Sequence, residues 1–192
     1  EVARRLKQRS KEIIIVFGGP LFFEKGFVNS ILNEEFVDII ISREGEVIFC
    51  ELVKLIENKQ DIATCRGIFF KKDGSIINTG PRELISNLDD LPFLDFSGLP
   101  LKDYDDSRHI PFMASRGCIQ KCVFCSSRTF WPGYRAMSGE RVFKEIEFCK
   151  RQQGKLNPNL CHIDFLDLLF NGNMKSLNEF CDLMCKAKLD IY

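Results

Sequence analysis

Continuous apolar runs near the start of the chain predict buried strands that alternate with helices. The runs cover residues 12–17 and 36–41 and are rich in Ile and Val. Such runs favour strands buried on both faces of a parallel sheet. Residues 2–9 and 27–32 are compatible with short helices, and apolar residues recur at helical spacing over residues 46–57. This β-α-β-α order predicts an α/β fold with a parallel sheet.

A hairpin and a stretch without periodicity follow. Asp73-Gly74 separates two short apolar runs, at residues 67–70 and 75–77, which is a strong hairpin signal. Residues 87–108 are rich in Pro, Asp and Leu, and their apolar side chains need cover. We therefore expect a first domain over residues 1–86, an interdomain linker over 87–108 that lies on a surface, and a second domain over 109–192.

The second domain also alternates strand-like and helix-like segments. Ser138 is a predicted N-cap because an amphipathic helical pattern begins directly after it. The expected elements, in chain order, are a strand at 110–115, a helix at 141–149, a strand at 160–167, a helix at 174–186 and the start of a strand at 188–192.

Composition narrows the class of protein. Lys plus Arg and Asp plus Glu both number 27 among 192 residues, so the net charge is zero. Without a basic excess, a nucleic-acid partner is not expected. No apolar run is long enough to span a membrane, no signal-peptide pattern opens the chain, and reduced cysteines favour the cytoplasm. Because the chain begins without Met and ends on a strand-like run, we interpret it as a fragment cut at both ends.

Three cysteines carry the clearest chemistry. Cys118, Cys122 and Cys125 have C-x3-C-x2-C spacing, and closely spaced thiolates let one loop present several soft ligands to one metal centre. A four-iron cluster held by three thiolates leaves one iron open to a small molecule, whereas structural zinc needs a fourth ligand, here Cys161 or His162. The other six cysteines lie in apolar stretches and are predicted to be buried: Cys50, Cys65, Cys149, Cys161, Cys181 and Cys185.

The cysteine spacing, with Phe124 before the third cysteine, resembles the signature of radical S-adenosylmethionine enzymes. The resemblance implies a [4Fe–4S] cluster on Cys118, Cys122 and Cys125, with S-adenosylmethionine chelated to the open iron. One electron from an external donor of the flavodoxin or ferredoxin type then cleaves the sulfonium and releases a 5′-deoxyadenosyl radical. The cofactor supplies that chemistry, and the protein orients it.

In that family the cysteine loop follows the first strand of an α/β barrel, on the face where such barrels place their sites. The resemblance implies that Asp167, with Asp164 as the alternative, meets the amino group of S-adenosylmethionine, because a carboxylate pairs with an ammonium. It also assigns Phe124 and Arg135 to the cofactor site. Residues 109–192 are then expected to form the first third of the barrel.

The first domain resembles the cobalamin-binding domain that precedes the barrel in one large subgroup. The matching residues are 15–20, 37–40, 44–46, 67–68 with 73–74, and 88–92. In that subgroup a double glycine, here Gly18 and Gly19, lets the backbone approach cobalamin because no Cβ intrudes. The family's D-x-H-x-x-G loop, which supplies an axial histidine in some members, would lie before Glu1.

Together these features predict a cobalamin-dependent type of radical enzyme that acts on a small molecule by methyl transfer, ring closure or rearrangement. The isolated piece is expected to be inactive because an open barrel admits water. One rival is a radical S-adenosylmethionine methylthiotransferase, whose first domain carries its own three cluster cysteines; Cys50 and Cys65 do not form such a set. The other rival is a non-catalytic zinc or iron–sulfur module.

Overall fold

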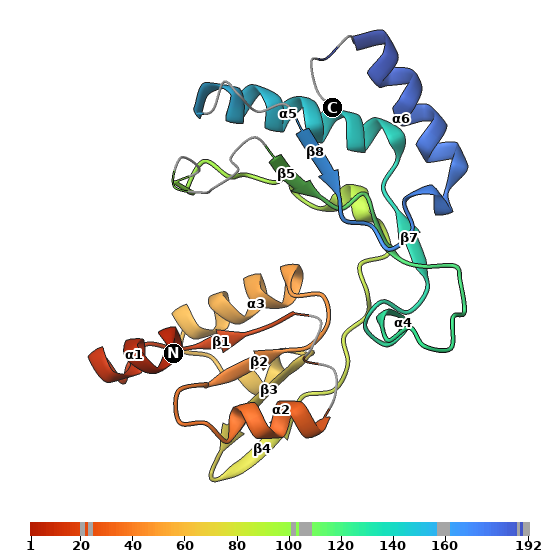
Figure 1. The fold of residues 1–192 in the computed structure, drawn as a ribbon. Coiled ribbons are helices and arrows are strands. Elements are labelled where there is room, and N and C mark those ends of the chain that lie inside the picture. The colour runs from red at the N-terminus through yellow and green to blue at the C-terminus, as the bar shows by residue number, and fades with distance from the viewer. Residues whose placement is uncertain are drawn as a thin grey trace. The chain divides into compact units, whose positions relative to one another are not determined.

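The computed structural model describes residues 1–19, 22, 25–100, 103, 109–156, 162–187 and 189. It divides the chain into two compact units, Glu1–Ile85 and Ser86–Tyr192 (Figure 1). Parts of several predicted segments lie outside the described residues: Pro20, residues 101–102 and 104–108 of the linker, the strand start at 160–161, and residues 188 and 190–192.

The first unit is a mixed sheet with helices. Its elements are α1 (Val2–Arg9), β1 (Val16–Phe17), α2 (Lys25–Leu32), β2 (Ile39–Ile41), α3 (Glu46–Glu57), the 3-10 turn η1 (Ile62–Thr64), β3 (Ile68–Lys72) and β4 (Ser75–Asn78). The strand order is β1-β2-β3-β4. Only β1 and β2 are parallel, and the pairs β2–β3 and β3–β4 are antiparallel.

The expectation of a parallel sheet is therefore wrong beyond β2, whereas the predicted hairpin is confirmed. Asp73 and Gly74 adopt φ angles of 51° and 76°, as a two-residue hairpin turn with both central residues left-handed requires. The turn makes β4 antiparallel to β3, and β3 also pairs with β2 in the antiparallel direction. The predicted helix over residues 46–57 has the observed bounds of α3.

The first strand is shorter and more exposed than its apolar run predicts. Ile14 is 45% exposed, and only Val16 and Phe17 are in strand conformation. The Asp38 carboxylate accepts the Ile15 N–H at 2.7 Å and pairs with Lys7 at 2.7 Å. Because a side chain takes the place of a backbone acceptor there, regular pairing of β1 with β2 begins only at Val16.

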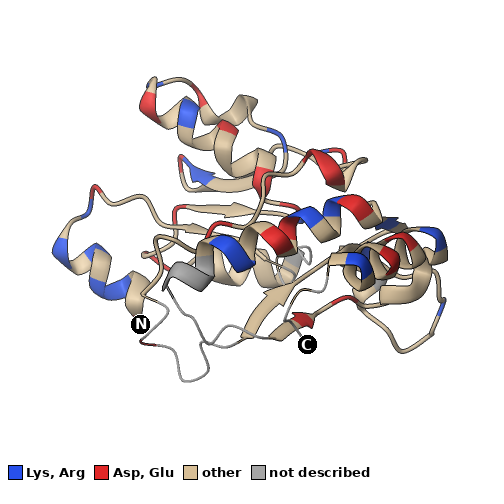
Figure 2. Ribbon diagram, turned by 90° about the horizontal axis from the view of Figure 1, so that it is seen from above, with Lys and Arg blue, Asp and Glu red and all other residues tan. Residues whose placement is uncertain are grey.

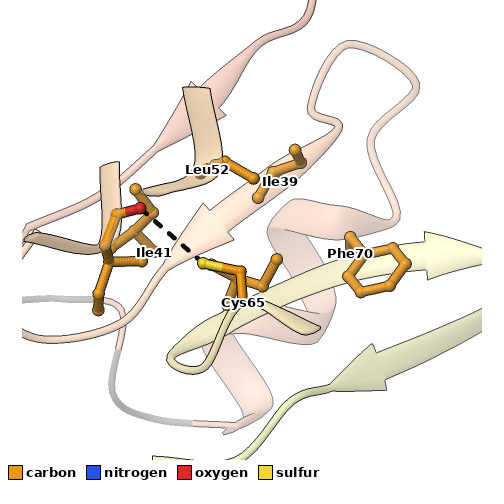
Figure 3. Close-up of a cluster of buried hydrophobic side chains, with 7 residues drawn as sticks. Ile39, Ile41, Leu52, Cys65 and Phe70 are labelled. Carbon is orange, nitrogen blue, oxygen red and sulfur yellow. Dashed lines mark hydrogen bonds between the residues drawn. The ribbon is translucent and has the colours of Figure 1, made fainter. Parts of the chain in front are cut away.

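The strand β2 is buried on both faces, as predicted. Ile39 and Ile41 pack with α3 residues Ile48 and Leu52 on one face. Ile40 packs on the other face with α2. Figure 3 shows the first cluster, in which the buried Cys65 thiol lies 3.9 Å from the carbonyl oxygen of Ile48.

The prediction that the remaining cysteines are buried holds only for Cys65 and Cys149. Cys50, Cys181 and Cys185 are exposed, and Cys161 lies outside the described residues. Cys181 and Cys185 lie on the apolar face of α6, which lines an open groove instead of a closed core. A cysteine in an apolar stretch is therefore not always covered.

Four of the eight residues of α1 are basic (Figure 2): Arg4, Arg5, Lys7 and Arg9. Three of them have partners within the first unit, because Arg5 pairs with Glu1, Lys7 pairs with Asp38, and Arg4 lies over the Phe36 ring. Within the described part of the chain, no helix combines the length and apolar character needed to cross a membrane.

The second unit contains a parallel strand pair with helices after each strand. Its elements are η2 (Leu88–Asp90), β5 (His109–Phe112), β6 (Ser115–Gly117), α4 (Ser127–Phe130), β7 (Tyr134–Ala136), α5 (Gly139–Leu156), β8 (His162–Phe165), η4 (Phe170–Gly172) and α6 (Met174–Ala187). β5 and β8 are parallel, and β6 and β7 form a separate antiparallel pair. Ser138 caps α5 as predicted, since its hydroxyl accepts the Arg141 N–H at 3.1 Å.

The strand predicted at 110–115 is two strands with a break between them. β5 ends at Phe112, and β6 starts at Ser115. At the break, the Ala114 N–H donates to the Asp167 carboxylate, and the Ala114 carbonyl accepts from Met137. Because these groups bond outside the β5–β8 ladder, the chain turns there from pairing with β8 to pairing with β7.

The start of the predicted linker packs on α5. The buried Arg141 guanidinium donates to the carbonyls of Asp89, Leu91 and Pro92 and pairs with the buried Glu145 carboxylate. Glu145 also accepts the Leu94 N–H at 2.7 Å. Residues 89–94 are therefore held on the second unit by a buried ion pair.

Candidate functional site

The cysteine loop connects the two paired strands β6 and β7. Cys118 follows β6 directly, and Gly117 of β6 pairs with Tyr134 of β7, so residues 118–133 form a loop closed at both ends. Gly117 has a φ of +82°, and a Cβ there would lie 1.7 Å from the carbonyl oxygen of Gly133. Only glycine fits this position, because the two arms of the loop approach backbone to backbone.

The three candidate ligands lie on the loop with different exposure. Cys118 and Cys125 are half-buried, and Cys122 is exposed. A turn in which the Cys125 N–H donates to the Cys122 carbonyl at 3.2 Å connects the last two. In the part of the chain that the structure describes, no three His, Cys, Asp or Glu side chains gather as a metal-binding group. The structure thus brings the cysteines onto one loop but does not converge their side chains on one point.

The donor chemistry of this loop still suits an iron–sulfur cluster. Three thiols on eight residues are soft ligands, and their exposure leaves room for a cluster larger than one ion. His162, one candidate fourth ligand for zinc, stacks on His109 with ring centroids 4.5 Å apart. This pair lies at the amino ends of β5 and β8, whereas the cysteine loop follows their carboxyl ends.

Asp167 lies at the carboxyl end of β8, beside the root of the cysteine loop. Its carboxylate accepts the Ala114 N–H at 3.1 Å and the Ser115 hydroxyl. Burial raises the pKa of Asp167, and the hydrogen bonds from Ser115 and Ala114 act in the opposite direction. Asp164, the alternative, is exposed and pairs with His109 at 2.8 Å within the strands. Of the two carboxylates, Asp167 is therefore the one adjacent to the loop.

Phe124 and Arg135 occupy contrasting positions. Phe124 is 88% exposed at the tip of the loop, next to the fully exposed Val123. Arg135 is half-buried in β7, where it pairs in register with Arg116 of β6. The Arg116 guanidinium lies 5.0 Å from the centre of the Trp131 ring. Arg135 is thus part of the loop base, and Phe124 is available to a ligand at the loop tip.

Gly18 and Gly19 belong to the first unit, where they follow β1 at the carboxyl edge of the parallel pair. A Cβ at Gly18 would make ordinary contact with Ile41, at 3.8 Å. Gly19 has a φ of +116°, and a Cβ there would meet none of the described residues within 4 Å. Among the described residues, none lies close enough to block the backbone at Gly19, which fits the close approach of a large flat cofactor such as cobalamin.

Sequence reasoning missed the residues that hold the candidate site together. The Ser115 hydroxyl and the Ala114 N–H donate hydrogen bonds to the Asp167 carboxylate. Gly117 lets the two arms of the loop approach closely at its base. A small polar residue and a glycine just before the first cysteine were the available signal. Their contacts come from residue 167 and residue 133, which no local pattern connects to them.

The chain has clear relatives among curated proteins, although no protein-family model matches it. It is 33% identical to an uncharacterized methyltransferase of Pyrococcus horikoshii over 99% of this chain and 41% of that protein. It is 29% identical to the anaerobic magnesium-protoporphyrin IX monomethyl ester cyclase of Synechocystis over 97% of this chain and 36% of the cyclase. The chain therefore spans less than half the length of these relatives.

Solved structures share the fold at lower identity. The cobalamin-dependent S-adenosylmethionine radical enzyme OxsB, with aqua-cobalamin and S-adenosylmethionine bound, matches 99% of this chain with 26% of its own, at a TM-score of 0.72 and 22% identity. The radical S-adenosylmethionine methyltransferase TsrM of Kitasatospora setae, with cobalamin and a [4Fe-4S] cluster bound, matches 96% of this chain with 35% of its own, at a TM-score of 0.62 and 16% identity.

Proposed function

Because the chain belongs to the B12-binding radical S-adenosylmethionine family, we propose that it is part of an enzyme that cleaves S-adenosylmethionine reductively at its cysteine loop. The main support for the proposal is that the cysteine loop and the Asp167 carboxylate lie at the same edge of the parallel strand pair, at its carboxyl end. The loop with Cys118, Cys122 and Cys125 follows β5 and β6, and Asp167 at the end of the parallel strand β8 bonds to the root of that loop. Such edges carry the sites of α/β folds.

Each group at this edge has a role in the proposal. The three thiolates hold the cluster, and the closed base formed by β6 and β7 sets where the loop begins. The Asp167 carboxylate pairs with the ammonium of S-adenosylmethionine, since opposite charges with a hydrogen bond form strong pairs. The bound [4Fe–4S] cluster would supply the electron that breaks the sulfonium bond, and an external donor would replace that electron.

Cobalamin is the second cofactor in the proposal. The open backbone at Gly19 and the small Gly18 would let the cofactor lie against the carboxyl edge of β1 and β2. The named relatives include both methyltransferases and cyclases, so the proposed outcome is methyl transfer to a small molecule or a radical ring closure.

Anaerobic reconstitution of the full-length protein with iron and sulfide tests the proposal. We expect about four irons, a broad brown absorption band, and 5′-deoxyadenosine formed from S-adenosylmethionine with a reductant. A methylated product would select methyl transfer over ring closure. One colourless zinc held by four side chains, with no S-adenosylmethionine cleavage, would show the proposal wrong.

The cysteine assignment has its own test. Cys122→Ala removes one of three ligands, so we expect the cluster and all cleavage to be lost. Cys50→Ala removes an exposed thiol in the first unit, and we expect iron content and cleavage equal to wild type. Equal iron in the two variants would contradict the ligand set.

A further inference from the structure

Ser115 has a buried hydroxyl beside the cysteine loop. The residue is 2% exposed and starts β6, three positions before Cys118. Its Oγ donates to Oδ1 of Asp167, and the carbonyl oxygen of Leu169 lies farther away, at 3.4 Å. A serine hydroxyl has one proton, which goes to the nearer and charged acceptor.

The Asp167 carboxylate is held by two consecutive residues. Oδ1 accepts from the Ser115 hydroxyl, and Oδ2 accepts from the Ala114 N–H at 3.1 Å. Both donors lie where the chain turns from β5 into β6. The carboxylate thus connects the end of β8 to the segment from which the cysteine loop starts, and its orientation depends on that segment.

The carboxylate keeps the capacity to bind a cation. Its two oxygens offer about four acceptor sites, and the Ser115 hydroxyl and the Ala114 N–H each take one of them, on different oxygens. Among the described residues, Ser115 supplies a hydrogen bond from its side chain, and the other donors are backbone N–H groups. Removing the hydroxyl therefore removes a hydrogen bond that favours the charged form in a partly buried place.

We propose that Ser115 is a positioning residue for S-adenosylmethionine: its hydroxyl holds the Asp167 carboxylate in the orientation that receives the ammonium group of the ligand. This inference rests on the proposed function and adds a residue to it. Ser115 does not touch the ligand itself. It acts through Asp167, so its effect must disappear when the Asp167 charge is absent.

Ser115→Ala in the full-length, iron-loaded protein should weaken S-adenosylmethionine binding by at least about tenfold at pH 7.5, because a hydrogen bond to a charged group contributes more than one between neutral groups. Equilibrium dialysis measures the dissociation constant, and iron analysis of the same samples should give wild-type values. Ser115→Thr retains the hydroxyl and should bind within about threefold of wild type. Ser115→Cys, of similar size but a weak donor, should fall between Thr and Ala.

The pH profile separates positioning from a general loss of structure. Burial raises the pKa of Asp167 and the Ser115 hydroxyl lowers it, so Ser115→Ala raises that pKa further. Ligand binding that needs the ionised carboxylate is then lost at a higher pH in the variant. We expect the acid midpoint of binding to move up by about one pH unit, since roughly 1.4 kcal/mol corresponds to one unit.

Ser138→Ala is the matched control. It removes another hydroxyl of the same unit, the N-cap of α5, and so lowers the stability of that helix. We expect the acid midpoint of S-adenosylmethionine binding in Ser138→Ala to equal that of wild type. In an Asp167→Asn background, adding Ser115→Ala should change the dissociation constant by less than about twofold, because the charge that the hydroxyl serves is gone.

The outcomes are separable. A wild-type dissociation constant and midpoint in Ser115→Ala, or an equal effect of that substitution in the Asp167→Asn background, would overturn the role of Ser115 alone. Failure of the wild-type, iron-loaded protein to bind S-adenosylmethionine would overturn the proposed function and this inference together.

Discussion

At the scale of single residues, the environment of a side chain decides its chemistry more than its type does. Asp164 and Asp167 lie three positions apart in similar apolar sequence. Asp164 pairs with His109 within the strands, and Asp167 bonds to the turn that begins the cysteine loop. The same holds for the cysteines, of which some are exposed ligand candidates and others are buried.

The buried thiol of Cys149 gives a prediction for pH dependence. Burial, then the Glu145 carboxylate, raises the pKa of Cys149 to about 12. The thiolate is the reactive form. At pH 8 only about one Cys149 side chain in ten thousand would be ionised, against about one in ten if its pKa had the unshifted value of 9.0. We expect alkylation of native Cys149 by iodoacetamide to be at least about a hundredfold slower than that of exposed Cys50, by mass spectrometry of the full-length protein.

The alkylation rate of Cys149 should then rise about tenfold for each pH unit above 8, with no plateau below about pH 11. In unfolded protein the two rates should be equal. A plateau for native Cys149 near pH 9 would show that its surroundings do not disfavour the thiolate.

At the scale of elements, the pair β6–β7 is the structural base of the candidate site. It holds the two ends of the loop that carries Cys118, Cys122 and Cys125. Its register depends on glycine at position 117, where the opposite backbone leaves no room for a side chain.

Gly117→Ala should separate the two strands, because the new methyl group would overlap the Gly133 carbonyl oxygen. We expect a loss of at least about 3 kcal/mol in the stability of this element and loss of bound iron, measured by limited proteolysis at residues 118–133 and by iron analysis of the full-length protein.

Gly133→Ala is the control for backbone strain. Gly133 has a φ of +78°, but a Cβ there would meet none of the described residues within 4 Å. Gly133→Ala should lower the stability of the element only by the energy needed to hold alanine in a left-handed backbone conformation, roughly 1 to 2 kcal/mol. Equal proteolysis of the two variants would show that the close approach at Gly117 does not govern the loop.

At the scale of the whole molecule, a buried ion pair decides which unit the connecting segment belongs to. Arg141 and Glu145 are 7% and 1% exposed, and together they bind the backbone of residues 89–94. The Arg141 guanidinium also lies 4.1 Å from the centre of the Phe93 ring. The segment therefore packs as part of Ser86–Tyr192.

Arg141→Ala should release this segment, because it leaves the Glu145 charge buried without its partner, at a cost of roughly 3 to 5 kcal/mol. Hydrogen exchange should accelerate at least about a hundredfold at residues 91–96, where the Leu94 N–H bonds to Glu145. Lys144→Ala, which breaks an exposed pair with Glu140 on the same helix, should change exchange by less than about threefold. Comparable acceleration in both variants would refute the role of the buried pair.

Local sequence determined much of this protein. The period of apolar residues predicts α3 and α6, Asp73-Gly74 predicts the hairpin, Ser138 predicts the start of α5, and the cysteine spacing predicts the candidate ligands. These features depend on residues within a few positions of one another, so a single segment contains the whole signal.

Only the tertiary structure decided where β5 stops, how β3 pairs, which cysteines are covered, and what holds Asp167. Features of this kind depend on partners far along the chain. Residue 167 bonds to the turn at 114–115, Asp38 keeps the regular pairing of β1 from starting before Val16, and Gly133 excludes a side chain at Gly117. Burial and hydrogen bonding depend on such distant pairs of residues, and the periodicity of apolar residues along one segment does not predict them.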